Sequence, residues 1–245
     1  MNPVSHLQDF QVIELRRYTI RDGERGNFAR YFEAYFPEAF QQLGAIAFGE
    51  GFERDNGTWF TWLRGFRDMD ARATVNAAFY YGPVWKEHRA TLNGLMTDSD
   101  NVLLLRPLDR DRALPVLPAV DVAREREGAT GLIVMQLFPV REGSIDAFAD
   151  RAEEAFARYR SAGIRETGVL ATLDAPNNFP QLPVRTDGPW LVWIGIVEDD
   201  AKLDAAFRSL MQDALPSLAA TGLLRGEPEF VVMDPAPRSR LRWLP

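Results

Sequence analysis

The chain has 245 residues, 46% of them hydrophobic and 26% charged, a composition typical of a globular protein with a sizeable core. Its net charge of −7 argues against nucleic acid as a partner, because no basic field would attract phosphate groups. Without cysteine, and with only His6 and His88 as histidines, the chain offers no disulfide, no thiolate or multi-histidine metal site and no cysteine nucleophile. The opening residues show no signal-peptide pattern and no apolar run could span a membrane, so we expect a cytoplasmic protein without a membrane partner.

One pattern of elements occurs twice along the chain. A β-rich run at residues 11–20 leads into Asp22-Gly23 and a helical pattern, and a second run at residues 131–140 leads into Glu142-Gly143 and another. We therefore predict two units, residues 1–108 and 129–235. A linker at residues 109–128 joins them, and a C-terminal tail at residues 236–245 follows.

The first unit is expected to follow the order β-α-β-β-α-β, which is that of a ferredoxin-like fold. Its elements are a strand at 11–20, a helix at 28–43 closed by Gly44, strands at 45–53 and 58–66, a helix capped by Asp68 or Asp70 that breaks at Gly82-Pro83 and resumes to 95, and a strand at 101–107.

The second unit is expected to repeat that order. Its elements are strands at 132–140, 164–173, 190–197 and 229–233, with helices around 145–159 and 203–211. Residues 174–189 form a long proline-containing excursion, which is either a lid over one end of the sheet or a surface loop. Because 18 of the 28 aromatic residues lie in residues 1–108, any site should be sought first in the first unit.

The predicted fold class is α+β, with two tandem ferredoxin-like units whose antiparallel sheets form a dimeric α+β barrel. A ferredoxin-like sheet has helices on one face only, so two sheets are expected to pack with their free faces together, within one chain or between two chains. A homo-oligomer is the expected assembly. The barrel interior then becomes the natural ligand cavity.

Alternation along the first strand places Glu14, Arg16 and Tyr18 on one side and the apolar residues on the other. With the apolar side assigned to the helices, the polar side faces the barrel interior, together with Trp62 and Arg64 of the third strand. An arginine fork there suits a carboxylate or enolate on an apolar ligand. The alternative is that Glu14 only neutralises Arg16 or Arg64, because a buried arginine needs a partner.

A second group of candidates begins at Tyr80-Tyr81 and ends at His88. Trp85 and His88 fall at helical spacing, so His88 lies on the apolar face of its helix. It is a candidate general base or haem ligand, since imidazole is the side-chain group that commonly serves in both roles; the alternative is a core histidine. The tail alternates arginine with other residues from 238 to 243, and either contacts a partner subunit, covers the cavity or frays.

The first unit resembles NIPSNAP-family domains. Glu14-Leu15-Arg16-Arg17-Tyr18 followed by Asp22-Gly23 is similar to their E-L-R-x-Y-x-x-x-x-G start. Three further stretches resemble the family: Trp62-Leu63-Arg64-Gly65-Phe66, Gly82-Pro83-Val84-Trp85, and residues 100–107. The second unit matches more weakly, through its element order and residues 178–185, and it lacks the E-L-R-x-Y start. The resemblance implies the dimeric α+β-barrel fold of cofactor-free monooxygenases, haem-degrading oxygenases and muconolactone-isomerase-like enzymes, without implying an activity.

Two hypotheses follow. In the first, a barrel cavity binds a small aromatic or apolar acidic ligand, and the protein is a binding protein or a cofactor-independent oxygenase or isomerase. His88 or Glu14 would abstract a proton, and Arg16 or Arg64 would stabilise the anion, with Tyr18, Trp62, Tyr81 and Trp85 as ligand-binding residues. Neither a metal nor a cofactor is required, and haem is the weaker possibility. In the second hypothesis, the protein is a non-catalytic interaction module with a solid barrel core.

Overall fold

Both halves of the chain form the predicted order of strands and helices. The computed structural model describes residues 3–4 and 9–244. The first half contains β1 (Val12–Ile20), α1 (Arg25–Tyr35), α2 (Pro37–Leu43), β2 (Ile46–Glu53), β3 (Trp59–Phe66), α3 (Met69–Tyr80), α4 (Pro83–Leu95) and β4 (Met96–Pro107). The second half contains η1 (Arg110–Arg112), β5 (Leu132–Pro139), α5 (Ile145–Ser161), β6 (Arg165–Thr172), β7 (Trp190–Val197), α6 (Asp200–Lys202), a π-helical turn η2 (Leu203–Arg208), α7 (Ser209–Ala220) and β8 (Glu229–Pro235).

In the first half, two element boundaries differ from the prediction. The helix expected at 28–43 is divided into α1 and α2, because Pro37 lacks the N–H that would continue the hydrogen-bond ladder and instead begins a new helix. Gly44 ends α2 as predicted, with a φ of 98° that a residue bearing a side chain rarely adopts. The last strand of the first half begins at Met96 and not at 101.

The strands close into one barrel within a single chain. In the described residues the order is β1-β3-β2-β8-β5-β7-β6-β4, and all neighbours are antiparallel. Each half contributes the ferredoxin-like order, β4-β1-β3-β2 and β8-β5-β7-β6, and the halves meet where β2 pairs with β8 and β4 with β6. The barrel therefore needs no second chain to close, and the expected homo-oligomer stays a prediction.

The same β-bulge occurs in both halves. The register of β2 on β3 skips one residue between Ala47 and Gly49, and that of β6 on β7 skips one between Glu166 and Gly168. Both glycines admit a close neighbour: a Cβ on Gly49 would lie 2.7 Å from Cβ of Leu241, and one on Gly168 would lie 2.8 Å from a methyl carbon of Leu114. The repeat is thus visible in the backbone as well as in the sequence.

The barrel interior is a packed hydrophobic core. Its side chains come from alternate positions of the strands, from the linker and from the tail: among them are Ile13, Leu15, Phe48, Leu63, Leu103, Leu105, Leu117, Ile133, Met135, Leu137, Val192, Ile194, Met233 and Leu241. The linker and the tail thus pack into the barrel core. The prediction of a ligand cavity inside the barrel is therefore wrong, because these apolar residues face inward and fill the interior.

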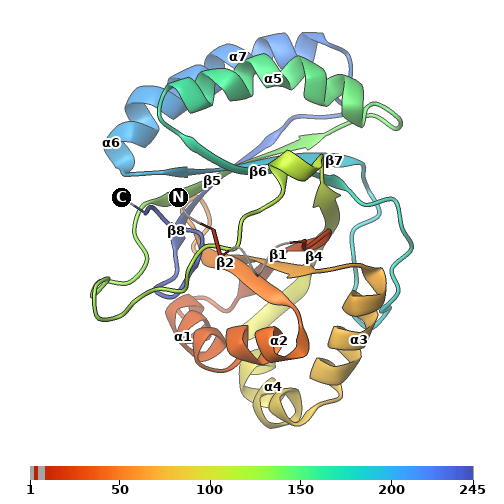
Figure 1. Cartoon of the computed structure of the whole chain (residues 1–245), viewed down its shortest axis with the longest axis vertical. Helices are drawn as coiled ribbons and strands as arrows, with labels where there is room; N and C mark the ends of the chain where they lie inside the picture. The colour runs from red at the N-terminus through yellow and green to blue at the C-terminus, as the bar shows by residue number, and fades with distance from the viewer. Residues whose placement is uncertain (1–2, 5–8, 245) are drawn as a thin grey trace.

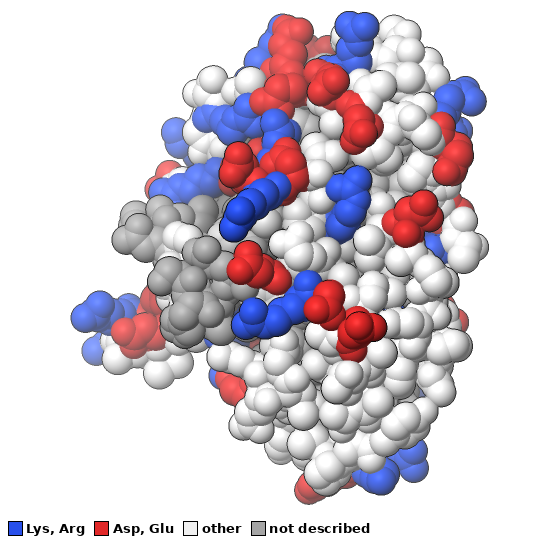
Figure 2. All heavy atoms as spheres, turned by 45° about the vertical axis from the view of Figure 1, so that its right-hand side comes forward, with Lys and Arg blue, Asp and Glu red and all other residues white. Residues whose placement is uncertain are grey.

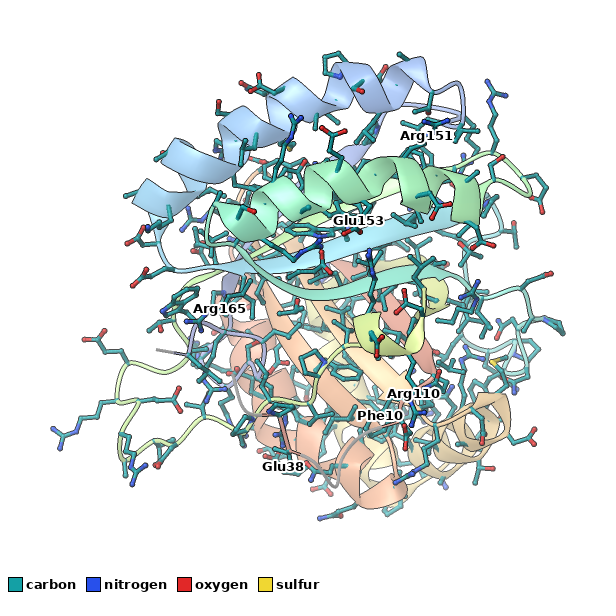
Figure 3. All side chains as sticks on the ribbon, turned by 45° about the horizontal axis from the view of Figure 1, so that its top comes forward. Phe10, Glu38, Arg110, Arg151, Glu153 and Arg165 are labelled. Atoms are coloured by element: carbon teal, nitrogen blue, oxygen red, sulfur yellow. The ribbon has the colours of Figure 1, made fainter. Side chains whose placement is uncertain are left out.

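Helices cover the outer faces of the barrel. In Figure 1, α5, α6 and α7 form one layer above it, and α1 to α4 form another below it. Figure 3 shows side chains extending between these layers and the strands. In Figure 2, acidic and basic side chains intermingle in the upper part of the view, whereas the lower part, which holds α3 and α4 in Figure 1, is mostly uncharged. In the described ranges, no helix is both long and apolar enough to cross a membrane.

Candidate functional site

Five of the predicted site residues lie between the barrel and the helix layer formed by α1 to α4, and not inside the barrel. Glu14, Arg16 and Tyr18 of β1 pair across the ladder with Arg64, Trp62 and Phe60 of β3. Tyr18, Trp62 and Phe60 belong to the core cluster that includes side chains of α1, α2 and α3. The predicted orientation of Glu14, Arg16, Tyr18, Trp62 and Arg64 is wrong because the apolar set of β1 is needed to fill the closed barrel. The polar set therefore faces the helices.

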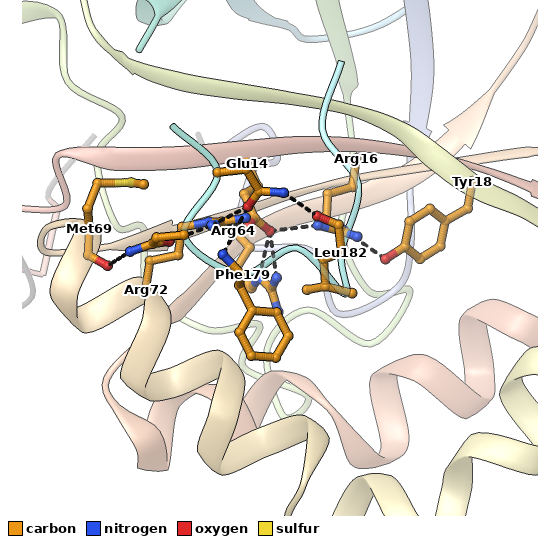
Figure 4. A network of polar contacts seen from close by, with 10 residues as sticks. Glu14, Arg16, Tyr18, Arg64, Met69, Arg72, Phe179 and Leu182 are labelled. Atoms are coloured by element: carbon orange, nitrogen blue, oxygen red, sulfur yellow. Dashed lines mark hydrogen bonds and ion pairs between the residues drawn. The ribbon is translucent and has the colours of Figure 1, made fainter. Parts of the chain in front are cut away.

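Three guanidinium groups share the carboxylate of Glu14 (Figure 4). Oε2 accepts from Arg16 Nη1 at 2.8 Å and from Arg64 Nη2 at 2.5 Å, and Oε1 accepts from Arg72 Nε at 2.7 Å. All four side chains are buried. Burial by itself would raise the pKa of the Glu14 carboxyl, but the guanidinium groups of Arg64, Arg16 and Arg72 lower it well below its usual range. Glu14 is therefore a fixed anion, which makes it a poor general base.

This cluster carries more positive than negative charge. In the part of the chain that the structure describes, Glu14 is the one carboxylate that pairs with Arg16, Arg64 and Arg72. Three formal positive charges thus face one negative charge in a buried environment, which favours a further anion beside them. Arg16 is the member of the cluster that lines a cavity. Its Nη2 has no hydrogen-bond partner among the described residues.

The cavity has a volume of about 420 Å³ and lies between β1, β3 and the helices α1 to α4. Its lining residues are Arg16, Tyr18, Phe32, Phe36, Phe40, Trp62, Phe79, Tyr80, Tyr81, Trp85, Lys86, Arg89, Leu92, Asn93, Met96, Ser99, Phe179, Gln181 and Leu182. Most of the walls are aromatic rings, and Arg16 and Tyr18 supply polar groups on β1. This combination suits a flat apolar ligand that carries an acidic oxygen.

The long excursion of the second half closes this first-half cavity. Phe179, Gln181 and Leu182 contribute to its wall. Arg72 Nη1 donates to Asn178 Oδ1 at 2.7 Å, and Asn178 Nδ2 donates to the carbonyl oxygen of Met69 at 2.6 Å. The loop at 174–189 therefore takes the position of a lid. Because Arg72 also binds Glu14, the lid and the arginine cluster are joined through one side chain (Figure 4).

Tyr18 is a buried phenol beside Arg16. Its Oη accepts a hydrogen bond from Arg16 Nε at 2.8 Å, and burial raises the pKa of Tyr18 above its usual value. The hydroxyl is therefore protonated at neutral pH, and no acceptor for its proton exists among the described residues. Since Tyr18 lines the cavity, its O–H is a donor for a ligand oxygen.

The structure separates His88 from these residues. Its Nδ1 lies 2.8 Å from Tyr31 Oη, and its ring stacks on Tyr35 at a centroid distance of 3.9 Å, between α4 and α1. His88 does not belong to the cavity lining, whereas Tyr81 and Trp85 do. As the one histidine within the described ranges, it cannot ligate haem in this cavity. The cavity residues therefore do not fit a histidine-ligated haem.

Sequence reasoning assigned no role to Arg72, and although it predicted residues 174–189 as a lid or a surface loop, it did not place that loop over the first-half cavity. One signal for Arg72 was available: the buried face of α3 consists of Arg72, Val75, Asn76 and Phe79, so a charged residue occupies an apolar stripe with helical spacing. The lid residues carry no such signal, because their contacts with Met69, Arg72 and Tyr81 span about a hundred residues of sequence.

Solved structures of similar fold extend over the whole chain. No family model and no curated protein matches the sequence. A putative monooxygenase from Fusobacterium nucleatum covers 93% of this chain and 93% of its own, with a TM-score of 0.62 and 10% identity. An anthrone oxidase-like protein covers 95% of this chain and 96% of its own, with a TM-score of 0.56 and 14% identity. These likenesses show the fold: an α+β barrel of two ferredoxin-like halves.

A NIPSNAP family protein from Agrobacterium tumefaciens is also similar, over 40% of this chain and 94% of its own, with 19% identity and a TM-score of 0.36. NIPSNAP proteins are thus among the structural neighbours. Membership of that family stays a prediction from the motifs of the first half.

Proposed function

We propose that the protein binds a small aromatic or otherwise apolar acid in the first-half cavity, with the anionic oxygen of the ligand against Arg16. The observation that carries this proposal is the imbalance of charge in the cluster, where three buried guanidinium groups share Glu14 and one of them borders an aromatic cavity. A ligand oxyanion supplies the missing negative charge and a hydrogen-bond acceptor for Arg16 Nη2.

The reaction that suits this site is cofactor-independent oxygenation of an enolisable aromatic ketone. The bound ketone or its enol loses a proton to solvent and becomes an enolate, because the guanidinium of Arg16 lowers the pKa of the enol. Arg16 and the Tyr18 hydroxyl stabilise this enolate. The enolate carbon reduces O₂ and forms a hydroperoxide. The hydroperoxide then loses water, which breaks its O–O bond and the remaining C–H bond of the same carbon. Overall, a CH₂ group and O₂ give a C=O group and H₂O. The full-length neighbours named putative monooxygenase and anthrone oxidase-like support this class of chemistry.

In the proposed reaction the proton goes to solvent, and neither His88 nor Glu14 has the proton-transfer role that the sequence predicted for it. Glu14 is held ionised by three arginines, and His88 lies outside the cavity. An isomerase would use the same enolate and return the proton to another carbon without consuming O₂. Oxygen uptake therefore distinguishes these two reactions.

The test uses 1,8-dihydroxyanthrone as the probe. Without oxygen, we expect it to quench the tryptophan fluorescence of the protein, because Trp62 and Trp85 line the cavity. In air, we expect oxygen uptake and quinone absorbance to exceed those of the protein-free solution. Arg16→Met should weaken binding by about a hundredfold, since it removes a charge-assisted hydrogen bond. Gln136→Met, at the equivalent position of the second half, should bind as the wild type does.

Each outcome has a separate meaning. Binding without oxygen uptake would contradict the oxygenase and leave the binding protein. Absence of binding to the wild type would contradict both. The second candidate, an interaction module without a ligand, is favoured by the filled barrel interior and predicts that the probe does not bind.

A further inference from the structure

We infer that the ligand of this cavity carries a second anionic group, at the end opposite to the oxygen that contacts Arg16. This inference rests on the proposed binding function and narrows its ligand class to aromatic compounds with two acidic groups. It starts from the rim of the cavity on α4, where Lys86, Arg89 and Asn93 recur at helical spacing and all line the cavity.

The charge of the lining is one-sided. Its charged residues are Arg16, Lys86 and Arg89, and no acidic side chain lines the cavity in the part of the chain that the structure describes. The whole chain is acidic, with 35 Asp and Glu against 28 Lys and Arg. The charged side chains of the cavity are thus all cationic, although the protein as a whole is acidic. This favours anionic ligands.

The cations lie at two different depths. Arg16 is 1% exposed and extends from β1, whereas Lys86 and Arg89 are exposed on α4. Arg16 is already paired with Glu14, but Lys86 and Arg89 form no ion pair within the described ranges. Lys86 is, moreover, one of only two lysines in the chain.

Aromatic side chains make up most of the lining that Arg16 shares with the rim cations. Phe36, Phe79 and Trp85 line the cavity along with both Arg16 and the rim cations. A ligand that satisfies every part of this lining has a phenolate or enolate oxygen at Arg16, a flat aromatic body against the rings, and a carboxylate or phosphate at Lys86 and Arg89. We commit to the carboxylate for the test.

The test compares 2-naphthol with 6-hydroxy-2-naphthoic acid, which adds a carboxylate at the far end of the same ring system. We expect the acid to bind the wild type about tenfold more tightly, because a charge-assisted hydrogen bond to the exposed Lys86 or Arg89 contributes less than one to the buried Arg16. In the double variant Lys86→Gln/Arg89→Gln, this advantage should disappear, so that the acid binds no more tightly than 2-naphthol does. The matched control is Lys202→Gln/Arg110→Gln, which removes the other lysine and an exposed arginine on η1 (labelled in Figure 3). It should retain the advantage.

The outcomes separate this inference from the proposal on which it rests. Equal affinities of the two probes for the wild type, or an advantage that survives in the rim variant, would overturn the second anionic group and leave the binding function in place. Failure of both probes to bind the wild type would overturn both. Arg16→Met should weaken both probes by a similar factor, because it acts on the oxygen that they share.

Discussion

Equivalent positions of the two halves hold different chemistry. In the first half, Glu14 pairs across the ladder with Arg64, and Arg16 pairs with Trp62. At the same places in the second half, Val134 pairs with Gly195 and Gln136 with Trp193. Each tryptophan lies at the same point of its sheet, but Trp62 lines a cavity of about 420 Å³ together with Arg16, whereas Trp193 does not line it and donates its indole N–H to Glu166.

The second half fills this space with rings. Trp193 stacks on Phe156 and Phe207 at centroid distances of 5.8 and 5.5 Å. A Cβ on Gly195 would lie 2.5 Å from the Trp193 ring, so the indole occupies the space that a side chain at this position would need. Where the first half has Arg64, the second half has no side chain, and its tryptophan packs there instead. Under the proposed function, one scaffold thus gives a first half that binds the ligand and a second half that supports it.

The largest effect on stability is expected from Glu14→Gln. The variant leaves Arg16, Arg64 and Arg72 buried without an anion, and breaking a buried ion pair in this way costs about 3–5 kcal/mol. The free energy of unfolding, measured by urea denaturation, should fall by that amount. A change below about 1 kcal/mol would mean that the cluster does not depend on this carboxylate.

In the second half the position equivalent to Glu14 is already the apolar Val134, so the comparison uses Gln136→Leu, at the position equivalent to Arg16. The Gln136 amide atoms make no hydrogen bond among the described residues, although the side chain is buried. Replacing an unpaired buried amide by an apolar group should leave the free energy of unfolding unchanged or raise it by about 1 kcal/mol. A large loss would show that the second half also depends on buried polar contacts.

A pH dependence is expected from Glu50, whose place in the second half is taken by Val169. Burial raises the pKa of Glu50 to about 8, and Glu33 adds to the shift. Because this pKa lies above that of the unfolded chain, the protonated form favours folding. The contribution of Glu50 to stability should therefore be fully present below about pH 4.5 and fall by a few kcal/mol as pH rises to about 8.

Glu50→Gln should remove most of this slope and be more stable than the wild type at pH 8.5. Urea denaturation at a series of pH values measures it. Glu38→Gln, which changes an exposed carboxylate nearby, should keep the slope. If the wild type and Glu50→Gln showed the same slope, the Glu50 carboxyl would not be the group responsible.

The smallest expected effect concerns the lid. Asn178→Ala removes the bonds to Arg72 and to the Met69 carbonyl, so the lid should open more often and the dissociation rate of 6-hydroxy-2-naphthoate should rise about fivefold in stopped-flow fluorescence. Asp187→Asn changes an exposed ion pair within the same loop and should leave the rate unchanged. Equal rates in the wild type and Asn178→Ala would mean that the loop does not gate the cavity.

Periodicity predicts the fold but not which face of a strand lies inside. The repeat, the element order and the closure of α2 at Gly44 follow from spacing and turn residues, because these are local properties of the chain. Alternation also groups Glu14, Arg16 and Tyr18 correctly. It cannot orient them, because both faces of β1 are buried here, one in the barrel and one under helices.

The parts of the site that sequence could not predict come from outside the first unit or from helix rotation. The lid reaches the cavity only because β4 and β6 pair, which brings the 174–189 loop beside α3. His88 and Trp85 both lie on α4, three residues apart, which is less than a full helical turn. His88 therefore contacts Tyr31, whereas Trp85 lines the cavity.

The central claim is that the first half binds the ligand and the second half supports it. The most direct test is a crystal structure of the wild type with 6-hydroxy-2-naphthoate. We predict one molecule per chain between β1, β3 and the helices α1 to α4, with its hydroxyl oxygen against Arg16 and Tyr18 and its carboxylate towards Lys86 and Arg89. Density inside the barrel or beneath α5 and α7, or no density at all, would contradict this account.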